Sequence, residues 1–199
     1  MIPSIILFAS GNGSNAITIH QKGIATNTYK VTCIVCNNPK AGILQYAATH
    51  NIPVEMITKK QFSEPAFLQI VQAYHASLLV LAGFLWMVPS YLIQAFGNRI
   101  INIHPSLLPK YGGEGMYGMH VHEAVVAHKE AESGITIHLV NEEYDKGEIL
   151  LQKKVDILPS DAASDVAKKV LALEHQWFWQ VVVSQLEKLN DTKASSIDE

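Results

Sequence analysis

The sequence contains few features of secreted, membrane-spanning or nucleic-acid-binding proteins. Only 2 of its 199 residues are cysteines, too few for a disulfide framework or a structural zinc site. The longest apolar run, Leu78 to Val88, has 11 residues, whereas a bilayer span needs about 20. The first nine residues lack the basic segment and cleavage site of a secretory signal, and a net charge of -3 argues against nucleic acid. We therefore expect a soluble, cytoplasmic protein without membrane or nucleic-acid partners.

The two cysteines form a C-x-x-C pair inside an apolar run, Val31 to Cys36. Such a run is typical of a strand, on which Cys33 and Cys36 point to opposite faces. A redox pair normally lies at the start of a helix. We interpret both thiols as small buried residues in a reducing compartment.

Acidic residues are absent from the first 54 positions. This absence affects which ligand the glycine-rich turn at residues 10–15 could bind. Gly11, Gly13 and Ala16 match the dinucleotide pattern G-x-G-x-x-A. That pattern requires an acidic residue about 20 positions later to hold a ribose, and none occurs there. Unpaired amides at a helix start suit a phosphate monoester instead, although a tight turn without a ligand stays open. The predicted cradle is Gly13, Ser14 and Asn15.

Apolar runs alternate with helical patterns along the chain, which predicts a doubly wound, mostly parallel α/β sheet. We expect strands at 5–9, 31–36, 54–57, 78–82 and 100–104, with helices at 41–50, 64–74, 89–96 and 119–128. Residues 134–140 alternate as in a strand with one wet face, and 149–155 form an antiparallel edge strand. A long C-terminal helix is expected to begin with Ser160 as its cap. Residues 1–190 form the predicted single domain, and 191–199 a flexible polar tail.

Asn102 and His104 interrupt the apolar strand at 100–104, two residues apart. This spacing places both side chains on one face, at the carboxyl edge where α/β sheets bind ligands. An imidazole can move a proton near neutral pH, and an amide can donate to an oxygen that gains negative charge. A histidine that only satisfies local backbone groups is the alternative.

Two carboxylates complete the set of chemically active groups. Glu174 lies on the apolar stripe of the long helix, where a carboxylate needs a partner, either a core salt bridge or an amine of a ligand. Asp145 lies in an acidic turn at 141–147 and could support His104. With the phosphate cradle, these groups suit attack by an amine on a carbonyl carbon. Neither Ser14 nor a cysteine has an activating base, so no covalent nucleophile is expected.

Three histidines in the predicted helix at 119–128 raise the possibility of a metal site. His120, His122 and His128 lack a constellation of the H-E-x-x-H kind. We expect a helix with exposed imidazoles and no bound metal.

Five segments resemble the folate-dependent formyltransferases, and the first narrows the resemblance to the phosphoribosylglycinamide formyltransferases of purine synthesis. They are S-G-N-G-S-N at 10–15, L-A-G-F at 81–84, N-I-H-P-S-L-L-P at 102–109, D-K-G at 145–147 and E-H at 174–175. The resemblance extends from Ile5 to about Leu189.

The resemblance implies formyl transfer from 10-formyltetrahydrofolate, a co-substrate, to the amine of glycinamide ribonucleotide. It implies an enzyme with small-molecule substrates. We expect either a monomer or a homodimer, between which the sequence does not decide. Asn102, His104 and Asp145 match the catalytic trio, Gly13, Ser14 and Asn15 the phosphate loop, and Glu174 the contact to the glycinamide end. The implied folate contacts are Lys60, Leu85, Trp86, Met87, Val88, Asn102, Asn141, Glu142, Glu143, Tyr144 and Asp145.

The sequence departs from the family pattern at the ends of both substrates. Trp86 stands where well-known members have arginine, and Leu171 and Leu173 replace polar residues near the ribonucleotide. Three rival functions stay open. Methionyl-tRNA formyltransferase would be expected to carry a further C-terminal domain, and formyltetrahydrofolate deformylase a regulatory domain before the catalytic one. A phosphate- or folate-binding module would have no turnover.

Overall fold

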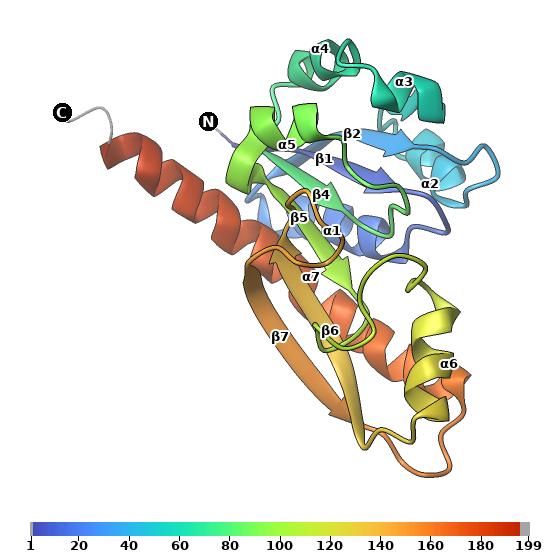
Figure 1. Ribbon diagram of the computed structural model, residues 1–199. Helices are drawn as coiled ribbons and strands as arrows, with labels where there is room; N and C mark the ends of the chain where they lie inside the picture. Colours follow the sequence, from blue (N-terminus) through green and yellow to red (C-terminus); the bar gives the residue numbers. More distant parts are fainter. Residues whose placement is uncertain (1, 196–199) are drawn as a thin grey trace.

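The computed structural model describes residues 2–195, in which seven strands form one sheet with helices on both faces (Figure 1). This architecture confirms the predicted α/β class. In chain order the elements are β1 (Ser4–Ala9), α1 (Ser14–Thr26), β2 (Lys30–Cys36), α2 (Ile43–Thr49), β3 (Val54–Met56), α3 (Lys59–Ser63), α4 (Phe67–Ala73), β4 (Leu78–Leu81), α5 (Ser90–Phe96), the 3-10 helix η1 (Gly97–Arg99), β5 (Ile100–His104), α6 (Met119–Ala127), β6 (Glu132–Leu139), β7 (Ile149–Asp156) and α7 (Ala163–Ser195).

The order of the strands creates a crevice between β1 and β4. The strand order in the sheet is β3-β2-β1-β4-β5-β6-β7. The strands from β1 to β5 are parallel to one another, β6 is antiparallel to β5, and β7 is antiparallel to β6. The chain therefore leaves β1 toward one edge and β4 toward the other. The Ser10 N–H donates to the Gly83 carbonyl at 3.1 Å, and the Leu85 N–H donates to Ser10 Oγ at 3.2 Å. These bonds join the two loops at the switch point where α/β proteins bind ligands.

Two apolar cores cover the faces of the sheet. One packs against α1, α2, α6 and α7, and the other against α3, α4 and α5. Cys36 lies in the first core and Cys33 in the second, both as buried free thiols, which confirms the prediction of opposite faces. No helix among residues 2–195 has the length and apolarity needed to cross a membrane.

β5 presents the two polar residues of interest on one face. Ile101 and Ile103 lie in the first core, whereas Ile100 lies in the second. Because side chains alternate along a strand, Asn102 and His104 share the face of Ile100. The predicted shared face is confirmed.

The predicted helix at 64–74 is observed as α4, which begins three residues later than predicted, and a further short helix, α3, precedes it. Thr58 and Gln61 form a capping box, in which each side chain bonds the backbone N–H of the other, and this starts α3 at Lys59. Pro65 disfavours a helical conformation at the residue before it, and Glu64 is extended. The helix therefore stops at Ser63, and α4 begins at Phe67.

The long helix begins later than predicted. α7 starts at Ala163, where Asp165 Oδ2 accepts from the Ala162 N–H at 3.2 Å, so Ser160 is not its cap. The Asp161 carboxylate instead accepts from the Leu158 N–H at 2.8 Å. α7 continues to Ser195, and residues 196–199 lie outside the described part, so the polar tail at 191–199 stays a prediction.

The expected wet face of β6 is also wrong. Thr136 and His138 are both buried. The segment after β5 covers this face, because Thr136 Oγ1 donates to the Ser106 carbonyl at 2.7 Å and accepts from the Leu108 N–H at 3.0 Å. The alternation of apolar and polar residues predicted the strand correctly, but it could not show that another segment packs on the polar face.

Candidate active site

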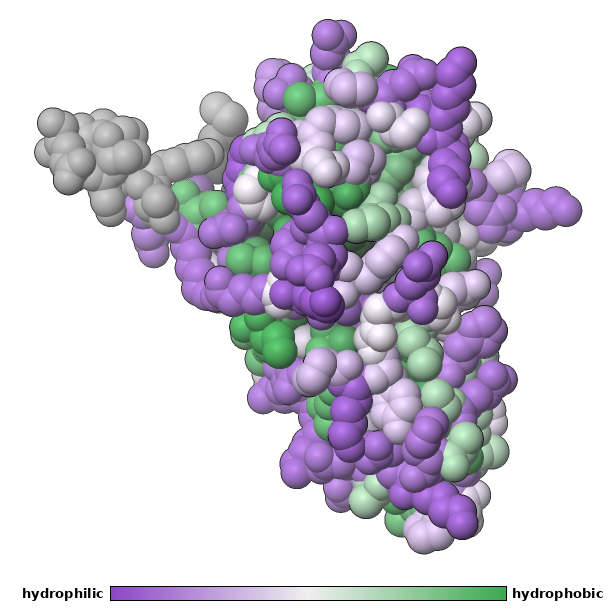
Figure 2. Space-filling view, in the orientation of Figure 1, coloured by the Kyte–Doolittle hydropathy of each residue, from purple (hydrophilic) through white to green (hydrophobic). Residues whose placement is uncertain are grey.

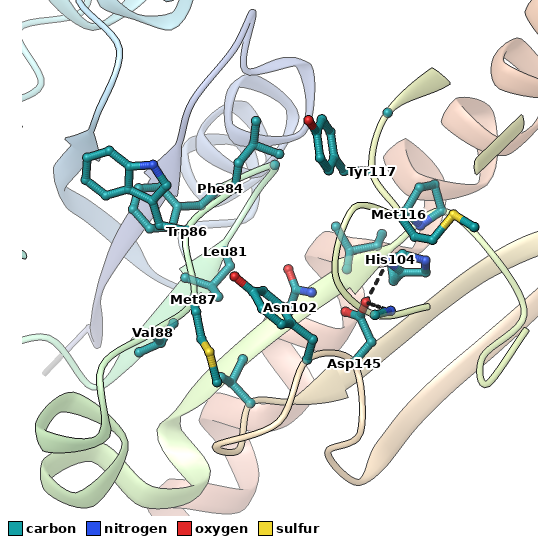
Figure 3. Close-up of a pocket in the computed structure, with 18 of the residues that line it drawn as sticks. Leu81, Phe84, Trp86, Met87, Val88, Asn102, His104, Met116, Tyr117 and Asp145 are labelled. Carbon is teal, nitrogen blue, oxygen red and sulfur yellow. Dashed lines mark hydrogen bonds and ion pairs between the residues drawn. The ribbon is translucent and has the colours of Figure 1, made fainter. Parts of the chain in front are cut away.

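A cavity of about 1000 Å³ opens beside the carboxyl ends of β4 and β5. Its walls come from the loops after β1 and β4, the segment after β5, the turn between β6 and β7, and the middle of α7. On the face shown in Figure 2, apolar residues gather around the middle, between hydrophilic ones. Figure 3 shows Asn102 in the cavity, between Trp86 on one side and His104 on the other.

His104 and Asp145 lie side by side in the wall of this cavity. His104 Nδ1 lies 3.4 Å from Asp145 Oδ2, and both side chains are almost fully buried. His104 Nε2 lies 2.6 Å from the Tyr111 carbonyl, which can only accept, so Nε2 carries the hydrogen. Nδ1 is therefore the nitrogen that is free to take a proton, next to the carboxylate.

The pKa of His104 reflects two opposed influences. Burial lowers it below its ordinary value, because a charged imidazole loses hydration. The neighbouring Asp145 carboxylate and the Tyr111 carbonyl raise it, but only in part. A neutral ring at pH 7 that can gain a proton beside an anion is suited to general-base chemistry.

Asp145 is held as an anion by its surroundings. Burial alone would raise the pKa of its carboxyl group, but His138, His104 and the Gly113 N–H outweigh burial and hold the pKa below its ordinary value. The Gly113 N–H donates to Oδ2 at 2.9 Å, and His138 Nε2 lies 3.5 Å from Oδ1. Asp145 therefore stays charged beside two imidazoles, where it favours their protonated forms.

His138 links the carboxylate to Asn102 and was missed in the sequence. Its Nδ1 donates to the Leu139 carbonyl at 2.7 Å, so in the neutral ring Nε2 accepts from Asn102 Nδ2 at 3.2 Å. This bond uses one amide hydrogen of Asn102 and leaves the other for a ligand. The antiparallel pairing of β5 with β6 places Asn102 opposite His138. The sequence contains no signal that predicts this register.

Glu174 lies at another end of the cavity with a single polar partner. It is 9% exposed, and Oε2 accepts from Asn15 Nδ2 at 2.6 Å. Burial raises the pKa of Glu174, and the bond from Asn15 offsets this only in part. Asn15 Oδ1 is buried without a partner among the described residues. The expectation of a carboxylate on the buried face of α7 is confirmed, and the core salt bridge is excluded in the described chain.

The glycine-rich turn starts α1 with its backbone amides uncapped. Gly13 is the N-cap with φ +73°, and no side chain caps this end. A Cβ at Gly13 would lie 2.6 Å from Ile43, so both conformation and packing require glycine. Asn12 and Asn15 reach the cavity, whereas Gly13 and Ser14 do not line it.

An apolar wall extends from β4 along the following loop, through Leu81, Phe84 and the four predicted residues Leu85 to Val88. The turn after β6 contributes Asn141, Glu143 and Tyr144, but not Glu142. Lys59 lines the cavity, and Lys60, to which the resemblance pointed, does not. Met116 and Tyr117, from the long segment after β5, complete the rim.

The expectation of exposed imidazoles on α6 is wrong for one of the three. His120 and His128 are exposed, but His122 is 6% exposed and lines the cavity. Burial and the nearby His104 lower the pKa of His122, and its Nδ1 has no partner among the described residues. Within residues 2–195, no group of three or more His, Cys, Asp or Glu side chains is arranged to hold a metal.

The chain is similar in sequence and in structure to known formyl transferases. The sequence profile of the formyl transferase family matches residues 4–182. Phosphoribosylglycinamide formyltransferase of Bacillus subtilis is 33% identical over 191 residues, which cover 93% of this chain and 95% of that protein. The crystal structure of phosphoribosylglycinamide formyltransferase from Bacillus halodurans superposes with a TM-score of 0.84 at 30% identity, covering 93% and 96% of the two chains.

Plant relatives are also similar but longer. The chloroplastic phosphoribosylglycinamide formyltransferase of Vigna unguiculata is 40% identical over 190 residues. The match covers 92% of this chain and 61% of the plant protein, so the chain spans about three fifths of that relative.

Proposed function

This chain belongs to the formyl transferase family, and we propose that it transfers a formyl group from 10-formyltetrahydrofolate to the amine of glycinamide ribonucleotide. The product is N-formylglycinamide ribonucleotide, an intermediate of purine synthesis. The observation that carries the proposal is the convergence of Asn102, His104 and Asp145 on one cavity, with His104 Nδ1 3.4 Å from the carboxylate.

The three residues have distinct roles in the transfer. The amine nitrogen attacks the formyl carbon, and the formyl oxygen, which gains negative charge, accepts from the free hydrogen of Asn102 Nδ2. The proton that the amine loses passes to His104 Nδ1, where Asp145 stabilises the resulting imidazolium. The bond from the formyl carbon to N10 then breaks, and the proton passes to N10 of the released tetrahydrofolate.

The ends of the cavity suit the two substrates. At the α1 end, Glu174 and Asn15 are available to the glycinamide group, and the uncapped amides after Gly13 suit the phosphate. Along the other wall, apolar residues from Leu81 to Val88 suit a flat pterin. A volume of about 1000 Å³ is large enough to hold both reacting groups together.

His104→Ala tests the proposal with His128→Ala as its matched control, since His128 is the exposed residue that follows α6 and lies outside the cavity. Formation of tetrahydrofolate is followed with purified protein and both substrates. We expect His104→Ala to lower kcat by about a hundredfold or more while substrate affinity is kept, and His128→Ala to match wild type. Wild-type turnover in His104→Ala would contradict the assignment.

Omission of one substrate separates a transferase from two of the rivals, the deformylase and the binding module. A deformylase would release formate from the donor without the ribonucleotide, whereas a transferase requires it. A binding module would bind either ligand without turnover. The monomeric or homodimeric state and the cytoplasmic location stay predictions, which size-exclusion chromatography with light scattering and cell fractionation would check.

A further inference from the structure

The segment that follows β5, residues 106–113, contacts both members of the His104–Asp145 pair. The Tyr111 carbonyl accepts from His104 Nε2 at 2.6 Å, and the Gly113 N–H donates to Asp145 Oδ2 at 2.9 Å. Figure 3 shows the imidazole and the carboxylate directed toward one another. The position of this segment therefore decides which nitrogen of His104 faces Asp145.

Tyr111 has a backbone conformation that large side chains rarely adopt. Its φ is +56°, in the left-handed region that favours glycine. A residue in this region keeps its conformation only where its surroundings hold it there. Tyr111 therefore needs contacts besides the one to His104 to keep its carbonyl at the imidazole.

Glu130, from the turn between α6 and β6, holds the side chain of Tyr111. The Tyr111 hydroxyl donates to Glu130 Oε1 at 2.9 Å. The neighbouring Lys110 Nζ lies 3.0 Å and 3.1 Å from the two oxygens of the same carboxylate. Two successive residues of the segment are thus bound to one carboxylate outside it.

The two partners of Glu130 are not equally restrained. The Lys110 side chain is 65% exposed, and so exposed an ion pair contributes little because water screens it. Tyr111 is half-buried and packs against the first core. Because a tyrosine side chain has few rotatable bonds, a fixed ring and a fixed hydroxyl together restrict the backbone that carries them. The Tyr111 hydroxyl is therefore the contact that can keep the carbonyl in place.

The contact between Tyr111 and Glu130 lies away from the substrates. Within residues 2–195, the lining of the cavity includes Gly113 but not Lys110, Tyr111 or Glu130. Ser106 Oγ donates to the Lys110 carbonyl at 2.6 Å, so the chain up to Lys110 is held independently of Glu130. A change at Glu130 would therefore reach the reacting groups through Tyr111.

We propose that Glu130 is a positioning residue for His104 and acts through Tyr111. It holds the Tyr111 hydroxyl, so that the Tyr111 carbonyl stays at Nε2 and Nδ1 stays the nitrogen that takes the proton. This inference rests on the proposed function, in which that proton comes from the amine. It adds a contact outside the cavity on which the state of the general base depends.

The ring of His104 can be observed without turnover by NMR of protein with isotopically labelled histidine, with His104→Ala to assign its signals. We expect the neutral ring of wild type to carry its hydrogen on Nε2. Glu130→Ala should mix the two neutral forms and lower the pKa of His104, because the Tyr111 carbonyl raises that pKa. The other titratable groups that face the ring in the described chain are unchanged by this substitution, namely Asp145, His138 and His122.

Three further variants separate positioning from the loss of an ion pair. Tyr111→Phe removes the hydroxyl alone. Glu130→Gln loses the charge but keeps an oxygen that can accept from that hydroxyl. Glu132→Ala is the matched control, because it removes a comparable exposed ion pair, with Lys154 at 3.0 Å, between β6 and β7.

We expect Glu130→Ala and Tyr111→Phe each to lower kcat about tenfold, with KM for both substrates near wild type. Both should move the midpoint of kcat/KM to lower pH. The double variant should lose no more than either single variant, because both changes break one contact. Glu130→Gln should keep most of the wild-type rate, and Glu132→Ala all of it.

A wild-type His104 spectrum in Glu130→Ala would overturn the proposal. A fall in kcat with an unchanged pH midpoint would also overturn it, since a merely structural contact would give that result, as would equal effects of Glu130→Ala and Glu132→Ala. A loss in Glu130→Gln as large as that in Glu130→Ala would assign the effect to Lys110 and exclude the route through Tyr111. If the spectra change as expected in a protein that transfers no formyl group, the proposed function fails and the positioning role stands.

Discussion

Asp145 and Glu174 are buried carboxylates in one cavity, but their surroundings act on them in opposite ways. Asp145 receives the Gly113 N–H and lies within 3.5 Å of two imidazoles. Glu174 has one amide donor and a mostly apolar helix face around it. The pKa of Asp145 is lowered and that of Glu174 is raised.

The difference shows how one type of side chain can serve two purposes. A carboxylate with its partners in place holds other groups in position and stays charged. A carboxylate short of partners is costly in the free protein, and a ligand that supplies donors relieves that cost. We therefore expect Asp145 to act on the reaction rate, and Glu174 on the affinity for the amine substrate.

Asp145→Asn should give the largest effect. The amide keeps the shape and can accept from Gly113, but it cannot stabilise a charged His104. We expect kcat to fall by about a hundredfold or more with little change in KM for either substrate, both measured by varying one substrate while the other is saturating. Glu148→Gln, an exposed change near the same turn, is the control. A normal kcat in Asp145→Asn would remove the distinction between the two carboxylates.

Glu174→Gln should act mainly on binding. Loss of a charge-assisted hydrogen bond to the amine end raises KM for the ribonucleotide about tenfold, while KM for the folate stays near wild type. Glu187→Gln on the exposed face of α7 controls for changes in the helix. If the folate KM rose instead, Glu174 would not face the ribonucleotide.

Sequence patterns predicted several of the side chains that form the site, but not which side chains contact one another. The 100–104 alternation predicted that Asn102 and His104 share a face, because strand geometry is local. The apolar stripe of the long helix likewise marked Glu174 as an unusual carboxylate. The partners His138, Asn15 and Lys59 depend on strand register, packing between α1 and α7, and the start of α3. These are long-range or side-chain-specific features that periodicity does not contain.

The pH dependence of the reaction sharpens the comparison further. Because burial lowers the pKa of His104, kcat/KM should rise with pH through a midpoint below 6.5 as the ring loses its proton. Asp145 raises that pKa, so Asp145→Asn should shift the midpoint to lower pH, whereas Glu174→Gln should leave it in place. Profiles between pH 5 and 8 check this, and a flat wild-type profile would count against His104 as the base.

The free energy of unfolding should change least, and it should change in opposite directions when Asp145 and Glu174 are replaced. Because the pKa of Asp145 is lowered in the folded state, its charge stabilises the fold above its unfolded pKa, and this contribution is lost as pH falls. Because the pKa of Glu174 is raised, its contribution is present below its unfolded pKa and is lost as pH rises through the folded pKa. At pH 7, Asp145→Asn should therefore lower the free energy of unfolding and Glu174→Gln should raise it, each by about 1 kcal/mol. Urea unfolding at pH 7 and pH 4 measures both, and we expect the differences from wild type to shrink at pH 4. Destabilisation by Glu174→Gln at pH 7 would show that this carboxylate already has the partners it needs, so no ligand would be required to complete its site.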